Sequence, residues 1–334
     1  MMKISILVPV YGVSKYIETC AVSLFEQTYQ ELEYVFVDDC TPDDSMEILL
    51  RVLERYPQRK AQVRILRHDH NRGLGAARST GVAAATGEYL FFADSDDSLA
   101  TDAIEKLVAR QQQTNADIVD GTIRLIHDDG SQGEKLPLLE YDTQTMLRLM
   151  LAQNTVSHNI WGRLIRHDLL TVNNIDFVEG VNMAEDYCTM TRLMYAATSR
   201  ACLNDIVYYY RATDTGAFEG WYKKHHLCSV LSANRVVGEF LAERDKNHTF
   251  VYPYELGVLN VFHRSLKTLP RNEVLAVCPY RPTHLIFRCC KALFVHQATR
   301  PLLRLAYLVI KHFYVKSAIS QSLNPSIPQS LNNP

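Results

Sequence analysis

The first 130 residues alternate short apolar segments with segments of helical periodicity. Between the apolar segments, apolar residues recur at a spacing of three and four, which is typical of amphipathic helices. Strands and helices that alternate in this way predict an open, mostly parallel α/β sheet flanked by helices. The expected strands are Ile4–Val10, Tyr34–Val37, Val63–Leu66, Tyr89–Ala93 and Ile118–Ile126.

From about Tyr141 the pattern changes and helical periodicity dominates. These patterns predict an α/β domain over residues 1–215, a helical C-terminal region over 216–318 and a flexible tail over 319–334, which is rich in Ser, Asn, Gln and Pro. Within the first two of these we expect helices at Thr143–Gln153, Arg163–Leu170 and Glu185–Ala197, a strand at Ile206–Arg211, and further helices after Trp221.

Charge is distributed unevenly along the chain. Lys and Arg number 35 and Asp and Glu 37, so no overall basic footprint for nucleic acid is present. From Val274 to Pro334, however, seven basic residues stand without a single Asp or Glu. Residues 281–316 mix these charges with apolar residues, and no run reaches the 18 or so that a spanning helix needs. This stretch predicts either peripheral contact with a membrane or helices that pack on the protein with a basic outer face.

The cysteines and the start of the chain indicate a reducing, cytoplasmic setting. None of the eight cysteines forms a C-x-x-C pair, which argues against a zinc ribbon or a thioredoxin-like motif. The start, Met1 to Pro9, has a short apolar run and no small-residue cleavage site, unlike a signal peptide.

Acidic residues follow two of the predicted strands. Asp38 and Asp39 follow the second, and Asp94 and Asp96 follow the fourth. Ligands of open α/β sheets bind at the carboxyl ends of strands, where a carboxylate commonly accepts a hydrogen bond from a nucleoside. Mg²⁺ or Mn²⁺ takes one or two carboxylates together with substrate phosphates, so Asp94 and Asp96 are candidate metal ligands. Solvated turns and helix caps are the alternative reading of both clusters.

A glycine-rich segment, Asn71–Arg78, resembles a dinucleotide fingerprint but departs from it. The fingerprint needs a small sixth residue, and Arg78 stands there; the segment also opens the third helix rather than the first. We interpret it as a loop and helix start whose Arg72 or Arg78 faces phosphate. An NAD-dependent oxidoreductase remains the less favoured alternative. No G-x-x-x-x-G-K-[ST] motif is present, which argues against a P-loop enzyme.

Two further candidates come from the second half of the α/β domain. Glu185 and Asp186 stand at a predicted helix start, where the helix dipole alone favours acidic residues; a functional role requires one of them to face the crevice of Asp96. Trp161 and Arg163 can form a pocket wall, although a Trp is more often a core residue.

The motifs stand in an order that resembles family 2 glycosyltransferases. None of the departures from the family pattern removes a carboxylate: Gly12 and Gly162 stand where Asn is common, Cys40 replaces a Gly, Ser79 an Asn and Arg163 a Lys. The matching segments are Ile4–Tyr11, Val37–Thr41 with Asp43-Asp44-Ser45, Asn71–Arg78 with Gly81, Gly87–Asp97, Trp161–Leu164 with Arg166, and Glu185-Asp186.

This resemblance implies the GT-A fold, which is Rossmann-like, with a nucleotide-sugar half at about 1–130 and an acceptor half at about 131–215. It implies inverting transfer from a nucleotide-sugar, a UDP-sugar first, to a glycan or lipid-linked glycan of a bacterial surface polysaccharide, with Mg²⁺ or Mn²⁺, in the cytoplasm or on the inner face of the cell membrane. The roles that it implies are Asp186 as catalytic base; Pro9, Tyr11, Asp39, Asn71, Arg78 and Asp94 in donor binding; Asp96 and Asp94 in metal binding; and Trp161, Arg163 and Glu185 at the acceptor. The rival functions are a sugar nucleotidyltransferase and a non-catalytic sugar-nucleotide-binding or scaffold protein.

Overall fold

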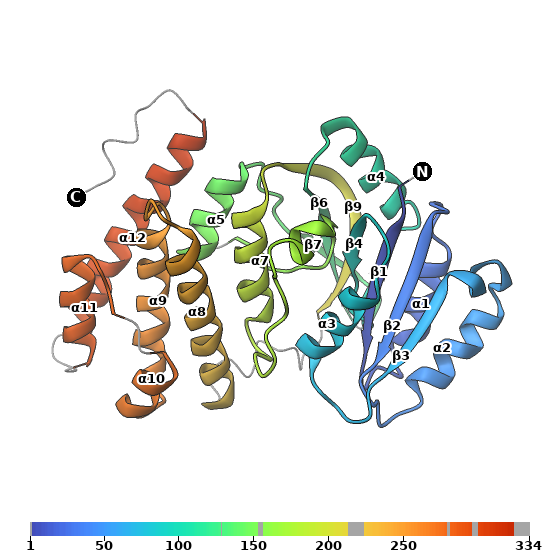
Figure 1. Cartoon of the computed structure of the whole chain (residues 1–334), viewed down its shortest axis with the longest axis horizontal. Coiled ribbons are helices and arrows are strands. Elements are labelled where there is room, and N and C mark those ends of the chain that lie inside the picture. The colour runs from blue at the N-terminus through green and yellow to red at the C-terminus, as the bar shows by residue number, and fades with distance from the viewer. Residues whose placement is uncertain are drawn as a thin grey trace. The chain divides into compact units, whose positions relative to one another are not determined.

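The computed structural model describes residues 2–127, 129–152, 156–212, 224–278, 281–295 and 300–323. The chain divides into two compact units (Figure 1). Unit 1 holds residues 1–140 and 159–219, and unit 2 holds residues 141–158 and 220–334. The segment 141–158, which we expected in the α/β domain, belongs to unit 2 because its helix α5 (Thr143–Leu151) packs on α9 (Val251–Ser265) and α12 (Arg300–Leu323).

Unit 1 is built on one nine-stranded sheet. Four parallel strands lie in the order β3 (Val63–Arg67), β2 (Leu32–Asp38), β1 (Ile4–Val10) and β4 (Tyr89–Phe92). The helices α1 (Ile17–Phe25), α2 (Ser45–Glu54) and α3 (Leu74–Ala84) connect them, with a 3-10 helix at Pro57–Gln62. Every residue of β2 and β4 is buried, as expected of strands covered on both faces. This arrangement confirms the mostly parallel α/β fold.

The other half of the sheet is mixed. Strand β8 (Arg163–Arg166) lies antiparallel between β4 and β6 (Ile118–His127), and β6 is parallel to β9 (Arg200–Ala212). The short strands β5 (Ser98–Leu99) and β7 (Gln132–Lys135) pair with β9 and β6, respectively. Helices α4 (Ala103–Thr114), α6 (Asp168–Thr171) and α7 (Glu185–Ala196) complete the unit.

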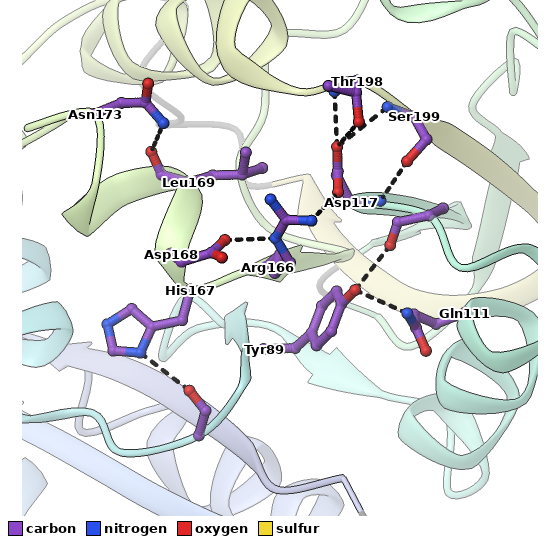
Figure 2. A network of polar contacts seen from close by, with 12 residues as sticks. Tyr89, Gln111, Asp117, Arg166, His167, Asp168, Leu169, Asn173, Thr198 and Ser199 are labelled. Atoms are coloured by element: carbon purple, nitrogen blue, oxygen red, sulfur yellow. Dashed lines mark hydrogen bonds and ion pairs between the residues drawn. The ribbon is translucent and has the colours of Figure 1, made fainter.

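The helix expected over Arg163–Leu170 is wrong. The structure has strand β8 there, followed by the four-residue helix α6. A run as short as Arg-Leu-Ile-Arg carries no usable periodicity, and its partners β4 and β6 are remote in sequence. Figure 2 shows Arg166 at the end of β8 between Asp117 and Asp168, an ion-pair bridge that fixes the turn into α6.

The described secondary-structure elements of unit 2 are all helices. It contains α5, α8 (Lys224–Arg244), α9, α10 (Arg271–Val277), α11 (Leu285–Val295) and α12. Helix α12 continues to Leu323, so residues 319–323 are helical where we expected a flexible tail; the remainder of that tail lies outside the described residues. No helix in the described part of the chain is long and apolar enough to cross a membrane.

Candidate active site

The loop that leaves β1 is held by side chains from the turn after β2. Three consecutive backbone N–H groups, of residues 12–14, donate hydrogen bonds to Thr41, Ser45 and Asp43 at 2.9, 3.1 and 2.9 Å. The acidic and hydroxyl residues of this motif therefore shape the loop directly. The loop carries Tyr11, which is 48% exposed at the edge where β1 ends.

Asp39 is buried and connects β2 with the loop before α3. Its Oδ1 lies 2.6 Å from Nδ1 of His68 and accepts a hydrogen bond from the backbone N–H of Arg72, while its Oδ2 accepts one from Gly73 N–H. Asn71 also accepts from Gly73 N–H, at 3.0 Å. Asp39 and Asn71 therefore lie together at the predicted nucleoside edge, and their roles in donor binding stay predictions.

Arg78 is the centre of the site. Its guanidinium is fully buried, and it donates to Asp94 Oδ1 and Asp186 Oδ1 at 2.8 Å each and to Glu185 Oε1 at 3.3 Å. Residues from the end of β4 and the start of α7 thus meet on one side chain of α3. We expected Arg72 or Arg78 to face phosphate. The contacts of Arg78 favour a role in positioning the carboxylates, and its role in donor binding stays a prediction.

The acidic turn after β4 contains two different kinds of carboxylate. Asp97 is buried and accepts hydrogen bonds from the Tyr208 hydroxyl and from Arg211 N–H, at 2.8 and 2.7 Å. Asp96, in contrast, has no side-chain or backbone donor from another residue in the part of the chain that the structure describes. Its carboxylate is therefore available to a ligand.

The carboxylates at this edge carry more negative charge than the neighbouring basic groups neutralise. Burial, and then the charge of Asp94, raise the pKa of Asp96 to about 6. Burial also raises the pKa of Glu185 and of Asp186, and for Asp186 the Arg78 guanidinium opposes this shift. A bound cation would relieve this excess of negative charge.

The two carboxylates fit a divalent cation that brings its remaining ligands with it. The described residues contain no group of three or more His, Cys, Asp or Glu side chains that could hold a metal ion by itself. Mg²⁺ and Mn²⁺ do not require such a cage when substrate phosphates supply oxygen ligands. Asp96, whose carboxylate has no donor from another described residue, and Asp94, two residues away, are the residues that would hold this ion.

Asp186 is held from both sides. Arg78 binds its Oδ1, and the backbone N–H of Ile160 donates to its Oδ2 at 3.2 Å. Ala184, the residue immediately before α7, has a φ of +65°, a left-handed conformation that is uncommon for a residue with a Cβ. This turn starts α7 with its two acidic residues at the helix N-terminus, where the helix dipole stabilises them.

The residues proposed for the acceptor have other partners. Trp161 is 9% exposed and stacks on Tyr208 and Tyr210, with ring centroids 4.8 Å apart in each case. Arg163 is buried and forms an ion pair with Asp120 at 2.8 Å. Glu185 lies beside Asp186 on Arg78. Of the three, only Glu185 lies in the carboxylate cluster, and the acceptor role of each stays a prediction.

Sequence analysis missed two residues of β9 that support the acidic turn. The Tyr208 hydroxyl accepts from Asp94 N–H at 2.9 Å, and Arg211 donates from Nε to the carbonyl of Asp96. The Arg211 guanidinium also lies 4.9 Å from the Tyr16 ring centroid. No local signal marks them, because they stand more than 100 residues from the turn that they hold.

The fold and the order of these motifs are those of a sugar transferase, and similarity to known proteins assigns the chain to that class. The sequence model described as glycosyl transferase family 2 matches residues 5–171. The chain belongs to this family. The match ends just after β8, so the family model covers the acidic turn but not Glu185 and Asp186.

Bacterial relatives support this assignment. Over 66% of its own length, this chain is 33% identical to the glycosyltransferase EpsJ of Bacillus subtilis. Over 64% of its own length, it is 28% identical to the glycosyltransferase YibD of Escherichia coli. The matched regions span 64% and 62% of those two proteins, that is, less than two thirds of their length. Staphylococcus aureus TarS, a poly(ribitol-phosphate) beta-N-acetylglucosaminyltransferase, is 29% identical over 65% of this chain and 36% of its own.

Solved structures show the same GT-A-type fold. TarS residues 1–349 in complex with UDP-GlcNAc superpose with a TM-score of 0.55 at 20% identity, over 96% of this chain and 92% of that one. A mannosyltransferase of Pyrobaculum calidifontis in complex with GDP-Man and Mn²⁺ gives a TM-score of 0.55 at 17% identity, over 98% and 88% of the two chains.

Proposed function

We propose that the protein is an inverting glycosyltransferase that moves a sugar from a UDP-sugar to a hydroxyl of a glycan or lipid-linked glycan. The observation that carries this proposal is the cluster in which Arg78 joins Asp94 to Glu185 and Asp186, next to Asp96, which has no donor from another described residue. The cluster lies at the edge where nucleotide ligands of such sheets bind. Family membership and the UDP and UDP-GlcNAc complexes of TarS support the donor class.

Asp186 is the proposed catalytic base. As the acceptor oxygen bonds to the anomeric carbon and the bond to the nucleoside diphosphate breaks, its carboxylate takes the hydroxyl proton. Arg78 and Ile160 N–H each bind one of its oxygens and so fix its orientation, leaving further lone pairs to accept the proton. Arg78 acts as a positioning residue for Asp186 and Asp94 together.

Asp96 and Asp94 are the proposed ligands of Mg²⁺ or Mn²⁺. The ion, when bound, supplies positive charge beside the departing diphosphate. Tyr208 and Arg211 hold the acidic turn in place through the backbone of Asp94 and Asp96, which keeps both carboxylates at the strand end.

The remaining site residues fall into the two proposed halves of the α/β domain. Pro9, Tyr11, Asp39 and Asn71 are proposed to bind the nucleoside part of the donor within the half at about 1–130. Trp161, Arg163 and Glu185 are assigned to the acceptor half at about 131–215. Because Arg163 is buried on Asp120, we propose that it shapes the acceptor wall from behind.

A thermal-shift experiment tests the donor and the metal together. The full chain is heated with UDP, GDP, CMP, ATP or NAD, each with and without Mn²⁺. A ligand at about 100 times its Kd adds about 2.7 kcal/mol of stability, so a specific ligand raises the unfolding midpoint measurably. We expect a Mn²⁺-dependent shift with UDP that is lost in Asp96→Ala and kept in Asp102→Ala, a matched change at a half-exposed Asp.

Two results would contradict the proposal. A shift with NAD alone would make the Gly73–Arg78 segment a true dinucleotide fingerprint. A UDP shift that is equally large without Mn²⁺ and in Asp96→Ala would remove the metal role of this residue. A shift with GDP instead of UDP would keep the transferase and correct the donor.

A further inference from the structure

Helices α11 and α12 of unit 2 carry exposed apolar side chains on their outer sides. Their inner sides contribute Phe287, Cys290 and Tyr307 to the core of the unit. The five exposed ones, which we call the apolar face, are Leu285 (74% exposed), Ile286 (46%), Leu308 (49%), Val309 (47%) and Phe313 (66%).

This clustering distinguishes the two units. In unit 1 the large exposed apolar side chains stand singly, on a loop, a helix, a strand and a helix end; they are Tyr11, Leu50, Ile65 and Val172. In unit 2 all those whose exposure is described lie on two helices that pack against each other (Figure 1). Isolated apolar residues on a surface are ordinary, whereas a cluster indicates an interaction site.

The start of α11 and the turn of α12 that carries Phe313 lie at the same level. The Tyr252 ring lies 4.9 Å from the Phe287 ring of α11 and 5.4 Å from the Tyr314 ring of α12. Leu285 stands two residues before Phe287, and Phe313 stands beside Tyr314. Along α12, Phe313 follows Leu308 and Val309 by five and four positions, which keeps the three on one side of the helix.

The charged side chains of α11 and α12, and Arg281 before them, are all positive. Arg281, Arg288 and Lys316 are exposed, and within the described ranges no acidic side chain pairs with them. The sequence contains no Asp or Glu beyond Glu273, so α11 and α12 carry no acidic residue at all. A surface that combines apolar residues with unpaired cations has the chemistry of an interfacial membrane contact.

We propose that this face of unit 2 docks on the surface of an anionic lipid bilayer. The apolar face would enter the boundary between headgroups and acyl chains, and Arg281, Arg288 and Lys316 would lie against lipid phosphates. Charge decides for this occupant over a second copy of the chain, because two such faces would repel each other. The docking itself does not depend on the proposed function. Only its consequence, that the protein meets a lipid-linked acceptor at this surface, rests on that function.

Vesicle co-sedimentation of the full chain, without donor or acceptor, tests the docking. We expect binding to vesicles of phosphatidylcholine and phosphatidylglycerol in equal parts, and at least tenfold weaker binding to phosphatidylcholine alone. Raising the salt from 0.1 to 1 M shortens the Debye length from about 10 to about 3 Å and should release most of the protein.

Variants with matched controls assign the binding to the proposed residues. The triple change Leu308→Ser, Val309→Ser and Phe313→Ser should weaken binding at least tenfold, whereas Val172→Ser, which removes a 76% exposed apolar side chain from unit 1, should not change it. Replacing Arg281, Arg288 and Lys316 with Gln should cost about fivefold per charge. Arg51→Gln with Lys60→Gln, on the surface of unit 1, is the control for charge.

Three results would overturn the inference. They are equal binding by the triple variant and the wild type, equal binding to neutral and anionic vesicles, and a concentration-dependent dimer that the triple variant loses while no vesicle binding occurs. A melting curve of each variant, with UDP and Mn²⁺, shows whether unit 1 is intact. If the wild type binds vesicles but no nucleotide, the proposed function fails and the docking inference stands.

Discussion

Two groups of carboxylates in unit 1, one buried and one partly buried, differ in how completely the protein neutralises them. Around β8, Asp120 is paired with both Arg163 and Arg200, and Asp117 accepts hydrogen bonds from Thr198 and bonds Arg166 (Figure 2). At the candidate active site a single guanidinium serves three carboxylates, and a fourth has no donor from another described residue.

The pKa values differ in the corresponding direction. Burial alone raises the pKa of Asp117, but the hydrogen bonds of Thr198 and the charge of Arg166 lower it overall. At Asp96, burial and Asp94 raise the pKa, and Arg211 and Arg78 offset this only in part. Satisfied carboxylates therefore stabilise the fold, whereas unsatisfied ones keep affinity for a ligand. The two groups should respond to mutation in different observables.

The largest effect is expected for Asp186→Asn. Asn keeps the shape and can still accept from Ile160 N–H, but it cannot take a proton, so turnover should fall by about 10²- to 10⁴-fold. Sugar transfer is measured with UDP-sugar and a glycan acceptor, and donor binding by thermal shift should remain. Glu185→Gln, at the neighbouring carboxylate on Arg78, is the comparison that assigns the base. If it abolishes transfer while Asp186→Asn does not, the base has been assigned to the wrong residue.

Asp120→Ala should act on stability instead. The change leaves two buried guanidinium groups without their carboxylate, which typically costs about 3–5 kcal/mol. Urea denaturation measures the loss. Asp168→Ala, which removes a half-exposed partner of Arg166 at the other end of β8, should cost less than about 1 kcal/mol. Equal losses in the two variants would mean that the buried pair contributes no more than a surface one.

Glu33 is a further carboxylate that the protein holds with several hydrogen bonds, and it leads to a prediction about how stability depends on pH. Burial would raise its pKa, but hydrogen bonds from Ser5, Thr86 and Lys3 lower it to about 2 from an ordinary 4.5. As the pH falls, the Glu33 carboxylate is therefore protonated in the unfolded chain before it is protonated in the folded one. Its contribution to stability is complete above pH 4.5 and is lost as the pH falls toward 2. The loss amounts to at most about 3 kcal/mol.

Unfolding free energies from pH 7 to pH 3 measure this contribution. Glu33→Gln should flatten the curve in that window, and Glu31→Gln, at an exposed position of the same strand entrance, should leave it unchanged. A wild-type curve that is already flat below pH 4.5 would show that Glu33 is not held in its charged form.

The smallest effect concerns the backbone beside the site. Cys40 has a φ of +57°, which costs a residue with a Cβ about 1–2 kcal/mol, so Cys40→Gly should stabilise the protein by about 1 kcal/mol. Thermal melting measures the gain. Asn174→Gly, at a φ of +52°, is the control, because Asn tolerates this conformation. A gain that is no larger at Cys40 than at Asn174 would rule out strain at Cys40.

The left-handed conformation of Cys40 is shared by two other departures from the family pattern. Gly12 and Gly162, where Asn is common, have φ values of +67° and +72°. Three of the departures thus fall at left-handed positions that favour Gly or Asn. At these positions the motif specifies a backbone conformation rather than a contact. Sequence comparison alone does not separate these two requirements.

The placement of the acids at the strand ends was predictable because strand order and direction follow from the βα alternation. The partner of those acids was not. Arg78 lies 16 residues from Asp94 and 108 from Asp186, and no local pattern distinguishes a phosphate-binding arginine from a buried one. The burial of Arg163 on Asp120 escaped prediction for the same reason, since it depends on β8 lying inside the sheet.

The insertion of β8 has a consequence for how the chain is made. Strand β4 has β1 on one side and β8 on the other, and β8 is synthesised more than 70 residues after β4. A nascent chain that has not reached Arg166 therefore exposes β4, fully apolar, as an open sheet edge. Such edges recruit other chains, so translation that stalls between residues 93 and 163 would produce fragments prone to aggregate.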